Sequence, residues 1–142
     1  LHETDRSTMT DLLFAYGTLL PGDVRWHFLR PFVVDEGTPD VAPGWLYDTG
    51  EGYPAARFGE LDGSGGSDSR IQGRVFRFVA ARLDEALRVL DDVEGAVAGD
   101  YRRVRVVTDG GHQAWAYAYG GGLELEPIDD GSWVAHLARR RA

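Results

Sequence analysis

One acidic residue in the sequence stands where the pattern calls for a hydrophobic one. It lies in the segment RLDEALRVLDDVEG, where Leu83, Leu87 and Leu90 recur at the spacing of one face of an α-helix. Glu94 follows Leu83 by about three helical turns, which returns it to that apolar stripe. Burial and the negative end of the helix dipole both disfavour a charged carboxylate, so we expect a raised pKa for Glu94. A carboxyl that titrates near neutrality can act as a general acid or base.

The end of this helix decides whether that interpretation holds. A helix is predicted over residues 82–93, and Gly95 is a residue of the kind that stops a helix. If the helix frays at Val93, Glu94 is merely exposed, and periodicity alone leaves both alternatives open. Asp92 falls on the polar face and is expected to be solvated.

A second candidate is a short turn at the end of an apolar segment. LLFAY, residues 12–16, is expected to form a buried strand that runs directly into Gly17, Thr18 and Leu19. Backbone N–H groups lose their strand partners at such a point, and glycine permits close approach of the backbone to another group. The sequence therefore raises the question of what the N–H groups of this turn bind.

The elements that position these residues are predicted from short patterns. A strand is expected over 71–79, where Gly73 suggests a bulge or a close backbone approach. A hairpin is expected between 101–107 and 113–119 around an Asp-Gly-Gly turn, and 59–70 has the composition of a flexible loop. Many short strands and one long helix predict an α+β fold, a small mixed barrel-like sheet with one main helix and short peripheral helices.

The second strand of the hairpin carries an aromatic row. Trp115, Tyr117 and Tyr119 point to one side of the strand, and the alanines between them point to the other. Core packing is the favoured interpretation of this row, because aromatic side chains fill protein interiors.

Length and composition limit the class of protein. The chain of 142 residues fits a single domain over 11–142, and residues 1–10 are expected to be a disordered extension or a tag remnant. With 23 acidic and 15 basic residues the net charge is −8, which repels phosphate backbones, so nucleic acid is not an expected partner. No apolar run is long enough for a membrane span and no signal peptide is evident, so a cytoplasmic location is expected.

Metal and thiol chemistry are not expected from this sequence. It contains no cysteine, which excludes disulfides, thiolate metal sites and thiol nucleophiles. The histidines His2, His27, His112 and His136 show no spacing typical of metal ligands, so surface or hydrogen-bonded histidines are expected instead.

Several short motifs in order resemble the γ-glutamylcyclotransferase-like (AIG2-like) family. They are YGTL at Tyr16–Leu19, GYPA at Gly52–Ala55, IQGRVF at Ile71–Phe76, LDDVEGAVAGDYRRVRV at Leu90–Val106 and IDDGSW at Ile128–Trp133. No single motif is decisive, but together they span nearly the whole chain.

The resemblance implies a barrel-like fold with a cavity at one end and an enzyme that releases 5-oxoproline from γ-glutamyl compounds without a metal or organic cofactor. It matches the family's catalytic glutamate to Glu94 and its strand-end binding loop to Tyr16, Gly17, Thr18 and Leu19. It also matches a tyrosine after the glutamate motif to Tyr101. Tyr16, Tyr53 and Tyr101 are candidates for walls of the pocket or for hydroxyl partners of the substrate carboxylate or of Glu94. For each tyrosine a purely structural role stays open.

The chemistry of such a reaction agrees with the residue types present. The substrate's own α-amine attacks its γ-carbonyl, so no Ser–His or Cys–His pair is needed, and one carboxyl can move the protons. A silent small-molecule binding domain on the same fold is the alternative. An amino acid, a peptide amine or a polyamine could each be the leaving group, and either a monomer or a homodimer is compatible with the sequence.

Overall fold

The computed structural model of the protein describes residues 10–50, 52–58, 69–98, 101–119 and 125–141. The strands are β1 (Leu12–Ala15), β2 (Thr38–Asp48), β3 (Pro54–Phe58), β4 (Arg70–Arg77), β5 (Tyr101–Val107), β6 (Gln113–Tyr119) and β7 (Glu126–Ile128). The helices are α2 (Trp26–Leu29), α3 (Leu83–Ala98) and α4 (Trp133–Arg141), with 3-10 turns η1 (Arg30–Phe32) and η3 (Ala80–Arg82).

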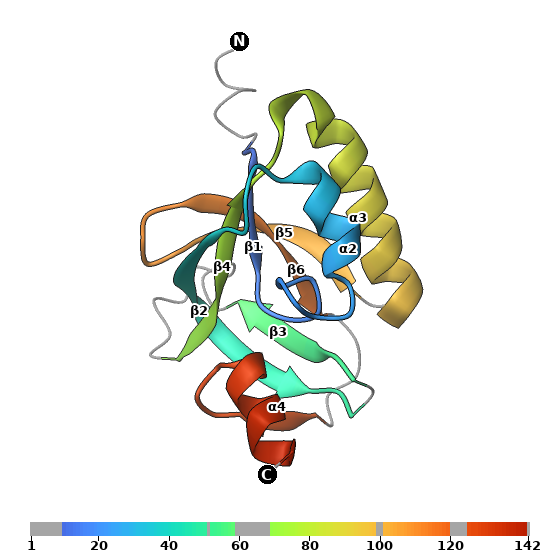
Figure 1. Ribbon diagram of the computed structural model, residues 1–142. Coiled ribbons are helices and arrows are strands. Elements are labelled where there is room, and N and C mark those ends of the chain that lie inside the picture. Colours follow the sequence, from blue (N-terminus) through green and yellow to red (C-terminus); the bar gives the residue numbers. More distant parts are fainter. Residues whose placement is uncertain (1–9, 51, 59–68, 99–100, 120–124, 142) are drawn as a thin grey trace.

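The strands form one curved sheet. In the described part of the chain the sheet is seven-stranded, with the order β3-β2-β4-β1-β6-β5 and β7 paired to β2. β1 and β6 run parallel, whereas β1 pairs antiparallel with β4, and β5 with β6. Because β3 also contacts β6, the sheet curls into a nearly closed barrel (Figure 1). The predicted α+β fold with a small mixed barrel-like sheet is confirmed.

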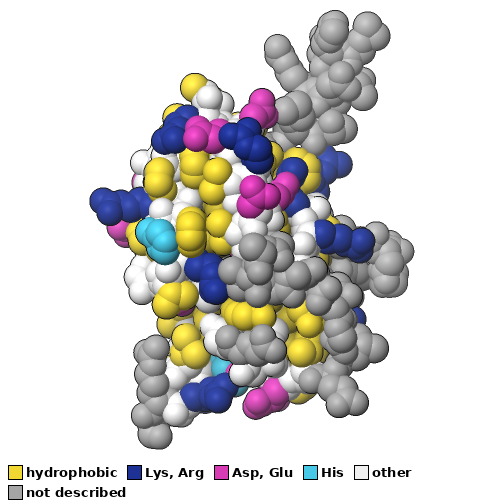
Figure 2. Space-filling model, turned by 90° about the vertical axis from the view of Figure 1, so that its right-hand side faces the viewer, with side chains coloured by type: hydrophobic (Ala, Val, Ile, Leu, Met, Phe, Trp, Pro, Cys, Tyr) yellow, Lys and Arg dark blue, Asp and Glu magenta, His cyan; other side chains and the backbone are white. Residues whose placement is uncertain are grey.

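The helices lie on different parts of this barrel. α2 and α3 lie side by side along one side of the sheet, and α4 lies at one end, next to β2 (Figure 1). α3 is the main helix, with 16 residues against 4 in α2. Over the face shown in Figure 2, the described arginines are scattered among acidic and hydrophobic side chains, and they form no continuous basic patch there.

Alternation along the strands divides the core into two clusters. Phe14 and Tyr16 join the cluster inside the barrel, and Leu13 and Ala15 face the layer of α2 and α3. β6 alternates in the same way, with its alanines inside the barrel and Tyr117 in the helix-side cluster. The predicted alternation of this strand is confirmed. Its small alanines leave room inside the barrel for the rings of Phe14 and Tyr16 of β1.

Gly73 has the close backbone approach that the sequence suggested. A Cβ at this position would lie 2.3 Å from the carbonyl oxygen of Ala15, too close for any side chain. Pairing of β4 is continuous through Gly73, opposite Asp40 of β2. The glycine thus brings β4 against the end of β1, where the turn at Gly17 begins.

The predicted end of the main helix is wrong. The helix was expected over residues 82–93 with a stop at Gly95, but α3 extends to Ala98. Glycine weakens a helix by about 1 kcal/mol relative to alanine without ending it, and the segment Ala96–Ala98 includes two alanines, which favour helix. Glu94 therefore sits inside the helix rather than at its last residue, and the fraying alternative does not apply. Asp92 is exposed, as expected.

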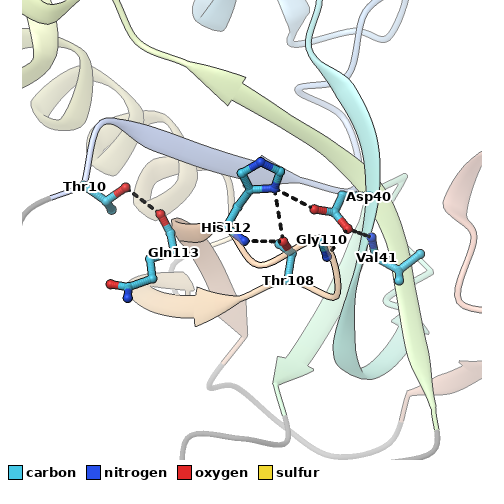
Figure 3. Close-up of polar contacts among 7 residues, drawn as sticks. All are labelled: Thr10, Asp40, Val41, Thr108, Gly110, His112 and Gln113. Atoms are coloured by element: carbon cyan, nitrogen blue, oxygen red, sulfur yellow. Dashed lines mark hydrogen bonds and ion pairs between the residues drawn. The ribbon is translucent and has the colours of Figure 1, made fainter.

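The predicted hairpin is confirmed, since β5 and β6 pair from Tyr101 opposite Tyr119 to Val107 opposite Gln113. Its turn is fixed to β2 by Asp40, whose carboxylate accepts hydrogen bonds from the backbone N–H of Gly110 at 3.1 Å and of Val41 at 2.8 Å (Figure 3). The same carboxylate lies 3.0 Å from Nδ1 of His112. The turn end of the β5–β6 hairpin is thereby held to β2.

α4 is attached to the barrel through a buried acidic residue of β2. Asp48 is 3% exposed and lies 2.8 Å from Nε2 of His136, which is also buried. Its carboxylate further accepts hydrogen bonds from Arg140 and from the N–H of Gly50. His136 is therefore a hydrogen-bonded histidine of the interior, one of the two roles expected for it.

Two expectations fall on segments outside the described residues. They are the loop predicted at 59–70, of which 59–68 are not described, and residues 1–9 of the predicted extension. Thr10 is described and belongs to the folded part, because its hydroxyl donates a hydrogen bond to the carbonyl of Gln113 and its own carbonyl accepts one from the Trp115 indole N–H at 3.0 Å.

Candidate active site

A pocket opens where the end of β1, the start of β3, α3 and the start of β5 meet. Its empty volume, counted out to its open mouth and including open solvent there, is about 420 Å³. The lining includes every residue that the sequence placed in the site: Tyr16, Gly17, Thr18, Leu19, Tyr53, Glu94 and Tyr101. Phe14, Ala15, Arg25, Pro54 and Tyr117 complete it. Segments distant in sequence thus converge on one cavity.

The turn after β1 is held by its own backbone. The N–H of Leu20 donates to the carbonyl of Gly17 at 3.0 Å, and the N–H of Arg25 donates to the carbonyl of Thr18 at 2.8 Å. Among the described residues, the N–H groups of Gly17, Thr18 and Leu19 meet no acceptor. The turn therefore keeps donors that a bound anion or carbonyl oxygen can use.

Gly17 is required by packing rather than by an unusual backbone angle. Its φ is not positive, but a Cβ there would lie 2.6 Å from Cγ of Pro54. The close approach that the sequence suggested is therefore one between the turn and the first residue of β3. Gly17 and Pro54 both line the pocket, so this contact forms part of its wall.

Glu94 enters the pocket from the apolar face of α3 and is only partly accessible to solvent. Burial raises the pKa of its carboxyl from 4.5 to about 7, and the positive charge of Arg25 opposes that rise. Burial, rather than a position at the helix terminus, is the dominant cause. A carboxyl with this pKa exchanges a proton readily near neutral pH, which is the property of a general acid or base.

The tyrosines form walls of the pocket, and hydrogen bonds fix the orientation of two of them. The Tyr16 hydroxyl donates to the carbonyl of Tyr117, and the Tyr101 hydroxyl donates to the carbonyl of Pro54. Tyr53 packs edge-on against Tyr101, with ring centroids 6.1 Å apart. Burial raises the pKa values of Tyr16 and Tyr101 above their ordinary range, so both remain neutral. Of the two roles considered for these two tyrosines, the contacts favour the wall.

Sequence reasoning missed the two polar residues among these additional lining residues. Tyr117 was interpreted as core; it is indeed buried, yet it also lines the pocket, and its hydroxyl donates to Asp91 at 2.7 Å. Arg25 was not considered at all. The signal that could have found it is a basic residue shortly after the turn at Gly17, in a chain with more acidic than basic residues.

The described residues offer neither a metal site nor a helix that could span a membrane. Within the described residues, no three histidine or acidic side chains come together in the way that a metal ion would require. In the same part of the chain, no helix is both long enough and apolar enough to cross a bilayer.

Comparison with known proteins identifies the family. The sequence pattern of the family described as gamma-glutamyl cyclotransferase, AIG2-like, matches residues 13–135, most of the chain. The protein belongs to this family. The match includes both the turn at Gly17 and Glu94, so the resemblance noted in the sequence is confirmed. No curated protein compared with the sequence matches it.

Solved structures share the fold of this AIG2-like protein. Uncharacterized protein PH0828 from Pyrococcus horikoshii is similar with a TM-score of 0.68 at 19% identity, covering 93% of this chain and 97% of that one. An AIG2-like protein from Mus musculus has a TM-score of 0.56 at 19% identity, covering 87% of each chain. Protein ytfP from Escherichia coli has a TM-score of 0.55 at 26% identity, covering 88% of this chain and 97% of that one. These similarities establish the fold.

Proposed function

We propose that this protein is a cofactor-independent γ-glutamylcyclotransferase-type enzyme that releases 5-oxoproline from a γ-glutamyl amine or amino acid, with Glu94 as general acid and base. The observation that carries the proposal is the position of Glu94, a carboxyl with a pKa of about 7 in the same pocket as the turn Tyr16–Leu19. Family membership supports the same reaction class.

The reaction begins with the loss of a proton from the substrate's α-ammonium to the Glu94 carboxylate. The freed amine attacks the γ-carbonyl carbon, forming the ring C–N bond. The bond from that carbon to the leaving nitrogen then breaks. Overall the α-nitrogen gives up two protons and the leaving nitrogen gains two, so a carboxyl that accepts and then donates a proton couples the two ends. This balance closes without water or an electron carrier.

The turn after β1 supplies the complementary electrostatics. Negative charge develops on the γ-carbonyl oxygen during attack, and fixed backbone donors stabilise such charge without reorganising. The N–H groups of Gly17, Thr18 and Leu19 are candidate donors, because no acceptor in the described part of the chain occupies them. The fixed tyrosine walls would also restrain the γ-glutamyl chain in a folded conformer, which removes entropy before the reaction.

The alternative is a domain of the same fold that binds a small molecule without catalysis. A panel of γ-glutamyl amino acids, peptides and amines, assayed for 5-oxoproline, separates the two. Release by the wild-type protein and by Asp92→Asn, but not by Glu94→Gln, supports the enzyme; Asp92 is the matched control because it is exposed on the same helix. Binding of panel members without release supports the alternative.

A further inference from the structure

The pocket contains Arg25, an arginine for which the described residues provide no hydrogen-bonding carboxylate. Arg25 lines the pocket, and its guanidinium carbon lies 5.9 Å from the ring centroid of Tyr53. Its backbone is fixed by the bond to Thr18, so the side chain starts from a defined point beside the turn. Among the described residues, no carboxylate or carbonyl accepts a hydrogen bond from this guanidinium. The part of the chain that the structure describes therefore leaves the guanidinium donors unused, so they can serve a ligand.

Arg25 and Glu94 form an unusual pair of charges. They share one pocket and are close enough for Arg25 to affect the pKa of Glu94, yet no ion pair links them within the described part of the chain. The other lining side chains are apolar or neutral. The pocket thus presents one cation and one carboxyl without neutralising either, which suits a ligand that carries both charges near one another.

We infer that Arg25 binds the α-carboxylate of the γ-glutamyl substrate and so restricts the enzyme to substrates whose α-carboxylate is free. The inference rests on the proposed reaction, in which Glu94 takes a proton from the α-ammonium. The α-carboxylate is bonded to the same carbon as that ammonium. A carboxylate on the leaving group, in contrast, lies beyond the γ-amide bond. A cation close to Glu94 is therefore better placed for the α-carboxylate.

The guanidinium suits this role by its geometry as well as its charge. Its planar fork can donate two parallel hydrogen bonds to a carboxylate, which fixes orientation as well as position. Held in that way, the α-carbon would present its nitrogen to Glu94, and the γ-carbonyl would remain free to reach the turn at Gly17. Specificity would then be set at the glutamyl end, and the leaving amine would vary.

The test compares Arg25→Gln with Arg88→Gln, an equal change of charge at an exposed position of α3 outside the pocket. Substrates are γ-glutamyl-alanine, γ-glutamyl-ethylamide, whose leaving group has no carboxylate, and the α-carboxamide of the latter. Arg25→Gln is expected to lower kcat/KM for the first two by the same factor, roughly 10- to 100-fold, the loss typical of one charged hydrogen-bond partner. The α-carboxamide should be a poor substrate for both proteins and lose nothing further.

Arg25→Lys should retain part of the activity, since the charge stays and the fork is lost. A loss confined to γ-glutamyl-alanine would mean that Arg25 reads the leaving group, and would overturn the inference. If no substrate is turned over, the proposed function fails, but binding still decides about Arg25. Wild-type protein should bind 5-oxoproline at least tenfold more tightly than its carboxamide, a difference that Arg25→Gln abolishes. Equal affinities, or no binding of either compound, would contradict the inference.

Discussion

Arg25 and Glu94 line the same pocket from different elements of the fold, and the charge of Arg25 holds the pKa of Glu94 lower than burial alone would place it. The two residues thereby set the pH range in which Glu94 changes its protonation state. A pocket that balanced the two effects differently would place this change at another pH.

The pH dependence of kcat/KM is expected to show this balance. The free enzyme needs Glu94 as a carboxylate to accept the first proton, so the rate should rise as pH increases through about 7. In Arg25→Gln the midpoint should move to higher pH, because the cation that favours the carboxylate is gone. Rate profiles, together with a carbon-detected NMR titration of the glutamate carboxyl, provide the measurement. An unchanged midpoint in the variant would contradict the electrostatic coupling.

Glu94 should also cost the protein stability at neutral pH and above. Its folded pKa lies above its ordinary value of 4.5, so the folded state binds more protons than the unfolded state between pH 4.5 and about 7. Stability contributed by the protonated form is fully present below pH 4.5 and is lost as pH rises through about 7. Glu94→Gln should therefore be more stable than wild type at pH 8, by up to about 3 kcal/mol, with little difference at pH 4. Urea denaturation at both pH values tests this; a variant less stable at pH 8 would argue against burial of the charge.

A side chain at Gly17 should damage both packing and function. The position faces the ring of Pro54 at a distance that leaves no space for a Cβ. This contact predicts that Gly17→Val impairs both substrate binding and folding, with a stability loss of about 1–3 kcal/mol from overpacking. Gly22→Ala is a useful comparison, because the turn there has open space around the glycine. Its positive φ still predicts a small loss of stability. Denaturation midpoints and 5-oxoproline affinity of the two variants are the readouts; normal stability of Gly17→Val would contradict the packing.

Asp48 is expected to fix α4 and to make the protein sensitive to acid. Burial opposes ionisation of this carboxyl, but hydrogen bonds from Gly50, His136 and Arg140 outweigh it and hold its pKa below the ordinary value of 3.8. Its contribution is thus present above pH 3.8 and is lost as pH falls through the folded pKa.

Asp48→Asn should therefore lower stability by about 2–4 kcal/mol at pH 7, because a buried charged partner is removed from the set. The difference from wild type should shrink below pH 3.8. Asp129→Asn, at an exposed position, is the control. Hydrogen exchange in α4 would locate the effect, and loss confined to residues distant from α4 would be inconsistent with this role.

Local patterns predicted the parts of the fold that depend on local structure. The Asp-Gly-Gly turn gives the hairpin of β5 and β6, and the leucine stripe places Glu94 on the buried face of α3. The end of α3 was missed because Gly95 is compatible with both stopping and continuing a helix, and the residues after it favour continuing. When the propensities for stopping and for continuing a helix are nearly balanced, the sequence cannot determine at which residue the helix ends.

Contacts between distant segments could not be predicted in the same way. The parallel pairing of β1 with β6 brings Leu13 opposite Trp115, and no local sequence pattern predicts this pairing. Tyr117 was correctly assigned to the core, but periodicity does not say that its part of the core borders a cavity. Arg25 reaches the pocket only because the turn folds back onto Thr18, which is a property of the tertiary structure.

The central claim is that the Glu94 carboxyl moves the protons of an intramolecular cyclisation. The most direct measurement is single-turnover release of 5-oxoproline from a substrate of the panel by wild-type protein, Glu94→Gln and Asp92→Asn, with binding of the same substrate measured for each. Loss of a general acid–base group predicts a rate at least about 100-fold lower for Glu94→Gln, with its fold and substrate affinity retained and Asp92→Asn unchanged. Release by Glu94→Gln at the wild-type rate would contradict the account.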